Sequence, residues 1–309
     1  MICTAACSGV PATESPVREV SGTAVSSLAM TPSPPASNPY SPAIRLLLIP
    51  GLVFLAWLLE VFLLAGNTRL LEHPEPIGFA IYTVIGCILT GMIVPVICIR
   101  KAFVSGAVNM FQIGFRTVRR TLLACSITGA IGFGMVILSN PFGTDRLAFA
   151  KAFLLLLPTA AATVMVCWVL AGTHVQAYVR SGGAVLSIST GVVITSILFA
   201  SATLAASPSV RQEGILFWPV CTGIGAALFF FAVRDVWATV IVVTGSGVFT
   251  GAGSFDPVYL NGFTPGIYAS SLLAVTALLA LHIWLSRNYA TIIVPADPES
   301  AAERIGDRF

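Results

Sequence analysis

Glu60 is the one acidic residue that lies well inside an apolar stretch of the sequence, between Trp57 and Phe62. A carboxylate at the centre of a membrane-spanning helix costs about 2.5–3.5 kcal/mol on insertion scales, and less towards the interface. We therefore expect Glu60 to turn away from lipid and to be protonated or paired. Lys151 is the best-placed cation, with Arg146 second. The functional hypothesis is a proton- or cation-coupling site of Glu60 and Lys151; the alternative is a structural hydrogen bond or ion pair between helices.

Two prolines, Pro95 and Pro158, fall inside apolar stretches that are long enough to be helices. A proline removes one backbone hydrogen bond and tends to kink a helix. Transporters use interrupted helices at their binding sites, so both prolines are candidate helix breaks. A kink without function is the alternative. Glycines also recur a turn apart, as in the GxxxG of Gly247 and Gly251, where close helix packing is the default interpretation.

A third group of residues could meet lipid headgroups. Between residues 100 and 120, apolar residues recur at helical spacing, and basic and polar residues fall mostly on the opposite side. This pattern predicts an amphipathic helix on the membrane surface. Its Arg116, Arg119 and Arg120 would contact anionic headgroups. The alternative is a helical extension of the preceding apolar stretch, packed against protein.

Other kinds of chemistry lack their residues in this sequence. There is no HExxH and no GxxxxGK[ST] motif, so we expect neither a zincin-type metal site nor a nucleotide-hydrolysing loop. His174 and His282 fall at a similar expected depth and could in principle hold a haem, but interfacial histidines with polar partners are commoner. We predict no catalytic residue, no metal and no cofactor. An enzyme that acts on lipid stays open, although no polar groups converge at one interface.

The elements that position these residues follow from composition. Of the 309 residues, 56% are hydrophobic and only 9% are charged, against roughly 25% charged in an ordinary soluble domain. The mean hydropathy is +0.92. A chain this apolar needs lipid in place of a polar surface. The sequence therefore predicts an all-α, polytopic integral membrane helix bundle over residues 43–287.

We expect about eight transmembrane helices, because about 20 apolar residues span a bilayer. The stretches are Leu46–Gly66, Ile77–Ile99, Thr121–Ser139, Ala152–Gly172, Ala184–Ala206, Ile215–Val233, Trp237–Gly253 and Thr264–Ser286. Only Arg234 and Asp235 separate the sixth from the seventh. A hairpin with this pair at its turn is the favoured interpretation. One tilted helix that buries the pair, giving seven spans, is the alternative.

The placement of basic residues predicts the orientation. With eight spans, one side carries twelve of them: Arg18, Arg45, Arg100, Lys101, Arg116, Arg119, Arg120, Arg180, Arg234, Arg287, Arg304 and Arg308. The other side carries four: Arg69, Arg146, Lys151 and Arg211. Since positive charge marks the cytoplasmic side, both termini are expected in the cytoplasm, with the protein in the cell membrane. Tryptophans near helix ends suit interfacial belts, with Trp168, Trp237 and Trp284 towards the cytoplasm and Trp218 outside.

Both tails are expected to lie outside the bundle. Residues 1–42 are rich in Ser, Thr, Ala and Pro and are predicted to be disordered. Residues 288–309 form a short polar tail. The leading functional hypothesis is a permease- or channel-like protein for a small solute or ion. The alternative is a non-catalytic subunit or assembly factor of a larger membrane complex. Expected partners are membrane lipid, and other membrane proteins or a second copy of the chain, but no nucleic acid.

Overall fold

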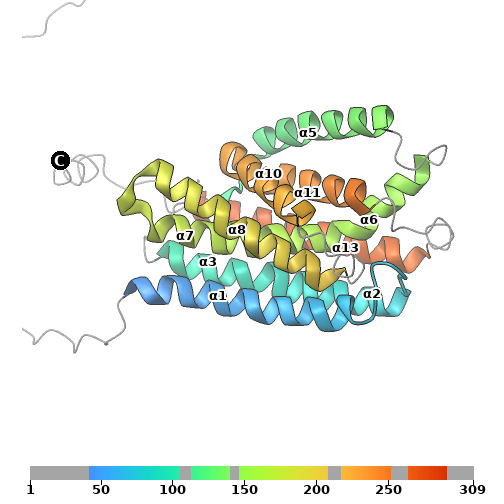
Figure 1. Ribbon diagram of the computed structural model, residues 1–309, viewed down its shortest axis with the longest axis horizontal. Coiled ribbons are helices and arrows are strands. Elements are labelled where there is room, and N and C mark those ends of the chain that lie inside the picture. The colour runs from blue at the N-terminus through green and yellow to red at the C-terminus, as the bar shows by residue number, and fades with distance from the viewer. Residues whose placement is uncertain (1–41, 105–112, 140–145, 208–216, 252–263, 291–309) are drawn as a thin grey trace, which may run out of the picture. The chain divides into compact units, whose positions relative to one another are not determined.

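The structure is a computed structural model, and it describes residues 42–104, 113–139, 146–207, 217–251 and 264–290. The described part of the chain consists of helices and turns, without a strand. Figure 1 shows the helices side by side in one bundle. The prediction of an all-α polytopic membrane bundle is confirmed. The predicted disordered head, residues 1–42, lies outside the described residues except for Pro42, where α1 begins. The predicted tail, residues 288–309, is helical up to Ala290, the end of α13, and lies outside the described residues from there on.

Eight helical rods make up the described bundle. The first two are α1 (Pro42–Val61) with η1 (Phe62–Gly66), and α2 (Pro76–Tyr82) with η2 (Thr83–Ile93) and α3 (Val94–Val104). The third and fourth are α5 (Val118–Ser139), and α6 (Arg146–Thr163) with η3 (Val164–Gly172) and α7 (Thr173–Tyr178). After the short η4 (Arg180–Gly182) come α8 (Ala184–Ala206), α10 (Phe217–Val233), α11 (Val236–Gly251) and α13 (Pro265–Ala290). Six rods are long and apolar enough to cross a membrane, and α10 and α11 are shorter apolar helices.

The chain reverses at Arg234 and Asp235. Helix α10 ends at Val233, and Arg234 adopts a left-handed conformation with φ of 53°. Its N–H donates to the carbonyl of Phe230 at 2.7 Å, a common way to close a helix C-terminus. Asp235 then caps α11, because its Oδ1 accepts a hydrogen bond from the N–H of Ala238 at 2.9 Å. The predicted hairpin is confirmed, and the alternative of one continuous helix through this pair is wrong.

The fourth rod is the centre of the bundle, and every residue of η3 is buried. It packs against α1, η2, α8, α11 and α13. By contrast, α5 lies along one edge of the bundle and contacts mainly α11 (Figure 1). Large apolar side chains of α5 are exposed, among them Leu122, Ile131 and Phe133. An apolar outer surface of this kind is what a lipid environment requires.

Three of the rods contain π-helical segments, which the hydropathy pattern did not predict. In a π-helix each N–H pairs with the carbonyl five residues back, and such segments are frequent at functional sites. The segments are η1, η2 and η3, of 5, 11 and 9 residues. Pro95 is the second residue of α3, directly after η2, so the hydrogen-bond register changes there without ending the helix.

Pro158 also leaves its helix continuous, since α6 runs from Arg146 through Thr163. Its ring deprives the carbonyl of Leu154, four residues earlier, of a backbone donor. Ser271 of α13 supplies a replacement, because its hydroxyl donates to the Leu154 carbonyl oxygen at 2.7 Å. Neither candidate helix break therefore interrupts its span. At Pro158 the freed carbonyl connects two helices.

The predicted surface helix over residues 100–120 does not form as one element. Helix α3 continues to Val104, residues 105–112 lie outside the described part, and residues 115–117 are not helical. The side chains of Ile113 and Phe115 are buried in the protein. The helical extension of the second span, given as the alternative, accounts for residues 100–104. Arg119 and Arg120 lie exposed at the beginning of α5.

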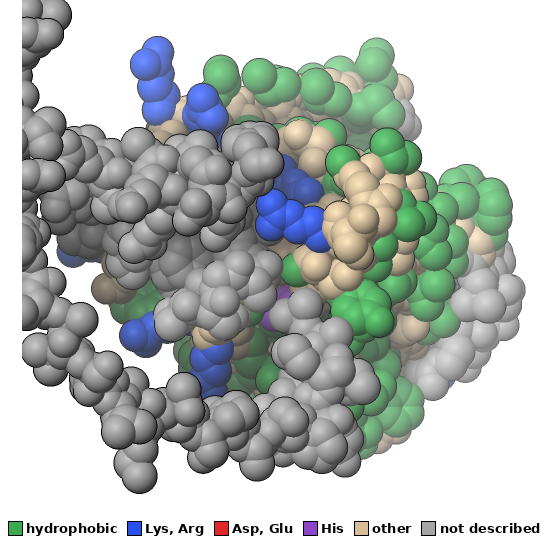
Figure 2. Space-filling view, turned by 90° about the vertical axis from the view of Figure 1, so that its left-hand side faces the viewer, with side chains coloured by type: hydrophobic (Ala, Val, Ile, Leu, Met, Phe, Trp, Pro, Cys, Tyr) green, Lys and Arg blue, Asp and Glu red, His purple; other side chains and the backbone are tan. Residues whose placement is uncertain are grey.

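The two ends of the bundle differ in charge. We call the end with residues 113–117, 179–183 and 234–235 the basic end, and the end with residues 67–75 and Ser207 the distal end. Figure 2 views the basic end, where Lys and Arg side chains gather and acidic side chains of the described residues are out of view. This separation follows the charge bias on which the predicted orientation rests.

Candidate functional site

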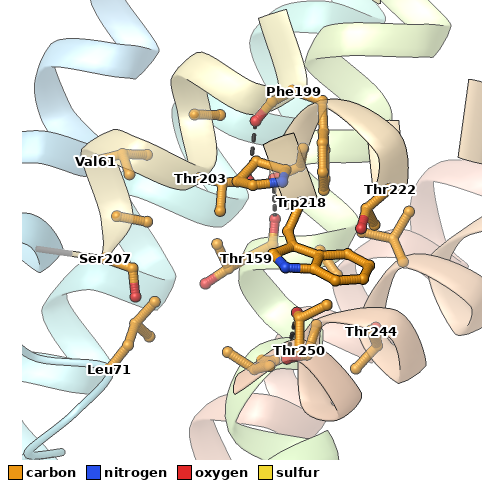
Figure 3. Close-up of a pocket in the computed structure, with 18 of the residues that line it drawn as sticks. Val61, Leu71, Thr159, Phe199, Thr203, Ser207, Trp218, Thr222, Thr244 and Thr250 are labelled. Atoms are coloured by element: carbon orange, nitrogen blue, oxygen red, sulfur yellow. Dashed lines mark hydrogen bonds between the residues drawn. The ribbon is translucent and has the colours of Figure 1, made fainter. Parts of the chain in front are cut away.

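A cavity of about 510 Å³ lies among α1, α6, α8, α10 and α11. Figure 3 shows hydroxyl and aromatic side chains from these helices pointing into one space. Its lining includes Leu71, Glu72 and Ser207 of the distal end, and Trp218 at the beginning of α10. Along α8 the lining runs from Phe199 to Ala206, about 10 Å of helix. The cavity is therefore a deep pocket that reaches the distal end of the bundle.

Aromatic rings and threonines dominate the walls. The rings are those of Trp57, Phe199, Trp218 and Phe249, and the threonines are Thr159, Thr163, Thr203, Thr222, Thr244 and Thr250. Thr163 and Thr244 donate to carbonyls of their own helices at 2.7 Å, and Thr203 does so at 3.0 Å. A hydroxyl has one proton but two lone pairs. These groups therefore retain acceptor capacity towards the cavity after their proton is engaged.

The cavity wall contains one acidic side chain. Glu72 is the only ionisable side chain among the described lining residues, and it is half-buried. A wall that combines a carboxylate with hydroxyl acceptors favours ligands that bring hydrogen-bond donors, whether neutral or cationic. It disfavours anions, which would meet lone pairs and a like charge.

A glycine contact fixes one wall of the cavity. Gly66, in η1, lies against the end of α8 so closely that a Cβ there would stand 1.9 Å from the carbonyl oxygen of Ala205. No side chain fits in that space, so only glycine permits this approach of backbone to backbone. The contact holds the distal end of α8 against the first rod, between cavity-lining Val61 and Ala206.

Glu60 does not face this cavity, although Trp57 and Val61 on the same helix do. Its carboxylate is half-buried at the seam between α1 and η2, where it forms a hydrogen bond with the hydroxyl of Thr90. The predicted partner was a cation on the fourth span. The structure instead connects Glu60 to the second span, through a residue that the sequence analysis did not consider.

Lys151 lies at a different level of the bundle. Gly91, next to Thr90, packs against Ala162, which follows Lys151 by eleven residues, about 17 Å at about 1.5 Å per residue. The structure therefore does not bring Glu60 and Lys151 together. Lys151 is half-buried near the distal end of α6. A coupling role for either residue stays a prediction.

The basic end holds a dense polar network around the α10–α11 turn. Asp235 is 1% exposed and accepts a hydrogen bond from the Thr121 hydroxyl at 2.8 Å in addition to the one from Ala238. The Arg116 Nε donates to the carbonyl of Arg234 at 2.9 Å, and its Nη2 to that of Val233 at 3.4 Å. Arg116 thus satisfies carbonyls at the end of α10, and the contact of Arg116, Arg119 and Arg120 with lipid headgroups stays a prediction.

His282 extends the network from α13. The indole N–H of Trp237 donates to its Nδ1 at 2.9 Å, so Nδ1 must be an acceptor. The other ring nitrogen, Nε2, lies 2.9 Å from the carbonyl oxygen of Arg116 and must donate to it. These two partners select the neutral Nε2–H tautomer. Both ring nitrogens are occupied within the protein, and the ring also packs edge-on against Phe115 at 5.3 Å.

Arg234 connects the turn to α7 of the fourth rod through a side-chain hydrogen bond. Its Nη2 donates to the side-chain oxygen of Gln176 at 2.8 Å, and Ser187 donates to the backbone oxygen of Gln176 at 3.0 Å. Burial, and then the positive charge of Arg116, lower the pKa of Arg234 from its usual value. Two neighbouring arginines are tolerated here because carbonyl and amide oxygens accept their hydrogen bonds.

Two tryptophans depart from the expected belt. Trp168 is completely buried in η3, with its ring 5.4 Å from that of Phe199, so it packs against protein rather than at an interface. Trp237 is engaged with His282. Trp284 and Trp218 remain partly exposed near opposite ends. Buried packing of an aromatic ring and interfacial placement give the same pattern in sequence.

Within the described ranges, no three His, Cys, Asp or Glu side chains lie close enough to hold a metal ion. No protein-family model, curated protein or solved structure matches the chain. The evidence on function therefore comes from the cavity and from its position in the bundle.

Proposed function

We propose that the protein is a permease- or channel-like transporter that binds a small solute in the distal cavity. The proposal rests on four lining threonines whose hydroxyls donate to carbonyls of their own helices, so that their lone pairs remain available to a ligand. They are Thr163, Thr203, Thr244 and Thr250. The solute is mainly apolar, bears O–H or N–H groups, and is neutral or cationic. A volume of about 510 Å³ suits such a molecule, since ligand pockets typically run from about 300 to 1,000 Å³.

Transport, rather than binding alone, is supported by the layer of packed side chains between the cavity and the basic end. Val243 of α11 lines the cavity, and Asp235, just before α11, belongs to the basic-end network. The two positions are eight residues apart in sequence, which corresponds to about 12 Å along a helix. Buried Phe231 and Val240 lie within this layer. A pocket that reaches one end, above a closed layer of comparable thickness, suits one state of an alternating-access cycle.

A ligand panel tests the proposal. Amines, alcohols and carboxylates of similar size are added to the purified protein in detergent, and thermal unfolding is followed. Amines and alcohols should raise the unfolding temperature, and carboxylates should not. The variant Thr203→Phe, which fills the cavity, should lose the shift, and it should also lose uptake of the best ligand into proteoliposomes.

Thr276→Phe is the matched control, because Thr276 is exposed on α13 and its hydroxyl also bonds its own helix, at 2.8 Å. This variant should retain both binding and uptake. Equal shifts from carboxylates, or full binding by Thr203→Phe, would contradict the proposal. Binding without uptake would reduce it to a binding protein.

A second candidate is a subunit of a membrane complex, and the exposed face of α5 favours it. Gly129, Gly132 and Gly134 of this helix have open space where a side chain would be. Small residues of this kind promote helix association in lipid. A stoichiometric partner that survives mild detergent and is lost in Gly132→Leu, together with silence in the ligand panel, would favour this alternative.

We place the protein in the cell membrane with the basic end in the cytoplasm, from the charge bias and the even number of rods. Reporter fusions after Phe309 and after Gln112 should report cytoplasm, and fusions within Arg69–Pro76 should report the outside. A reporter after Phe309 that lies outside would overturn this orientation.

A further inference from the structure

Glu60 and Thr90 meet on the outside of the bundle rather than in its interior. Both are half-buried. The leucines around them are exposed, with Leu59 at 58%, Leu63 at 51% and Leu89 at 48%. Trp57, one turn before Glu60, is fully buried and faces the cavity. In a membrane, hydrocarbon would therefore reach the seam that holds the carboxyl group, and neither Glu60 nor Thr90 lines the solute cavity.

The two oxygen neighbours of Thr90 restrict where protons can lie at this site. Its Oγ1 has two oxygen neighbours, a carboxyl oxygen of Glu60 and the carbonyl oxygen of Ile85, the latter at 2.6 Å. A threonine hydroxyl has a single proton, so it can donate to only one of them. If Thr90 donates to Ile85, the contact with Glu60 is a hydrogen bond only when the carboxyl group carries a proton and donates it to Oγ1.

The surroundings of Glu60 agree with a neutral acid. Among the described residues, the hydroxyl of Thr90 is its hydrogen-bond partner, and no ion pair with Glu60 is found. A carboxylate that is partly exposed to hydrocarbon needs a cation or several donors to be stable. A protonated carboxyl group needs only one acceptor, which Thr90 provides.

We propose that Glu60 and Thr90 form a proton-binding site on the lipid-facing surface of the bundle, separate from the solute cavity. Glu60 is a neutral acid that donates to the hydroxyl oxygen of Thr90, and this hydroxyl in turn donates to the carbonyl oxygen of Ile85. The proposal depends on the membrane architecture and not on the solute, so it can hold even if the cavity binds nothing.

Reaction with a lipid-soluble carbodiimide tests the site in the full chain. A carboxylic acid adds its O–H across one C=N bond of dicyclohexylcarbodiimide: the proton goes to nitrogen, and the carboxyl oxygen bonds the central carbon. The O-acylisourea then rearranges by acyl migration to a stable N-acylurea, so the peptide gains the mass of the whole reagent. In phospholipid vesicles, peptide mass spectrometry should find this adduct on Glu60, and at least tenfold less on Glu72 and Glu75 of the distal end.

Infrared spectra provide an independent readout. The difference between the wild-type protein and Glu60→Gln, near neutral pH, should contain the C=O stretch of a protonated carboxyl group. Thr90→Val keeps the shape but removes the hydroxyl, so it should move this band to higher frequency. Thr276→Val, which removes an exposed hydroxyl bonded to Leu272, should leave the band in place.

Two outcomes would overturn the proposal: a carboxylate band in place of the protonated one, or labelling of Glu72 and Glu75 while Glu60 stays unmodified. The labelling arm uses the wild-type chain, so it decides the question even if Glu60→Gln fails to fold. A silent ligand panel with a labelled Glu60 would contradict the solute cavity alone.

Discussion

The distal cavity and the basic-end network differ in how most of their polar side chains are bonded. In the cavity, hydroxyls such as that of Thr203 donate to a carbonyl of their own helix. At the basic end, Thr121 reaches Asp235 across 114 residues of sequence, and His282 reaches Arg116 across 166. Bonds within one helix leave helices free to separate, whereas bonds between helices hold them together. The same residue types can therefore line an opening or close one.

The largest effect is expected for Asp235→Ala, which attacks the network at its centre. It removes the cap of α11 and leaves the buried Thr121 hydroxyl without its acceptor. Loss of a cap costs about 0.5–2 kcal/mol, and an unsatisfied buried group about 1–3 kcal/mol. Thermal unfolding in detergent should show a loss of about 2–4 kcal/mol. Asp235→Asn, which can still cap α11, should lose less than half as much; equal losses would mean that charge rather than hydrogen bonding matters here.

Arg116→Gln should have the next largest effect. It removes the donors to the carbonyls of Val233 and Arg234, and hydrogen bonds to charged groups contribute about 1.5–3 kcal/mol when buried. Because Arg116 is only half-buried, we expect a loss of about 1–2 kcal/mol in the same assay. Arg119→Gln, at an exposed position, should change stability by less than about 0.5 kcal/mol. Similar losses for both would indicate a general effect of charge.

In the body of the bundle, a hydrogen bond from Ser271 to the Leu154 carbonyl replaces the backbone bond that Pro158 cannot make. Ser271→Ala should cost about 1 kcal/mol in the wild-type chain, because the Leu154 carbonyl loses its donor. In a Pro158→Ala background the new N–H of residue 158 can serve that carbonyl, so the cost should fall by half or more. A double-mutant cycle measures the difference, and additive costs would show that the two residues act independently.

The smallest effect belongs to the cavity wall. Thr203→Val removes a bond that stays within α8, so stability should change by less than about 0.5 kcal/mol. Thr121→Val, the same substitution in the network, should cost about 1 kcal/mol or more, since it leaves a buried carboxyl oxygen of Asp235 without a donor. If both variants lost stability equally, the distinction between the two regions would fail.

The sequence was sufficient for the helices and for the turn between the sixth and seventh. Apolar stretches of about 20 residues are expected to form helices in lipid. The charged pair Arg234 and Asp235 indicated a break between helices, because charged side chains are costly inside the bilayer. Ala184–Ala206 was predicted with the bounds that α8 has. The threonines in the fourth to seventh spans were a signal of the cavity that went unused, because each one alone has an ordinary structural explanation.

Which side chains meet could not be predicted, for a physical reason. Hydropathy gives depth roughly but says little about which helices are neighbours, so Glu60 was assigned a cation when its neighbour is Thr90. Arg116 was predicted to contact lipid headgroups because its segment is amphipathic, and its hydrogen bonds to the carbonyls of Val233 and Arg234 were not foreseen. The buried Asp235 was seen only as a turn residue, although its place directly before α11 is a typical capping position.

The π-helical segments bear on how this sequence can change over time. Each holds one more residue per hydrogen-bonded turn than an α-helix would, so the loss of one residue can be absorbed by a return to α-helix. Elsewhere in a span, a deletion would rotate everything after it by about 100° around the axis. Single-residue deletions should therefore be tolerated within 62–66, 83–93 and 164–172, and alignments of descendants of this chain should place their gaps there rather than in the neighbouring α-helical turns.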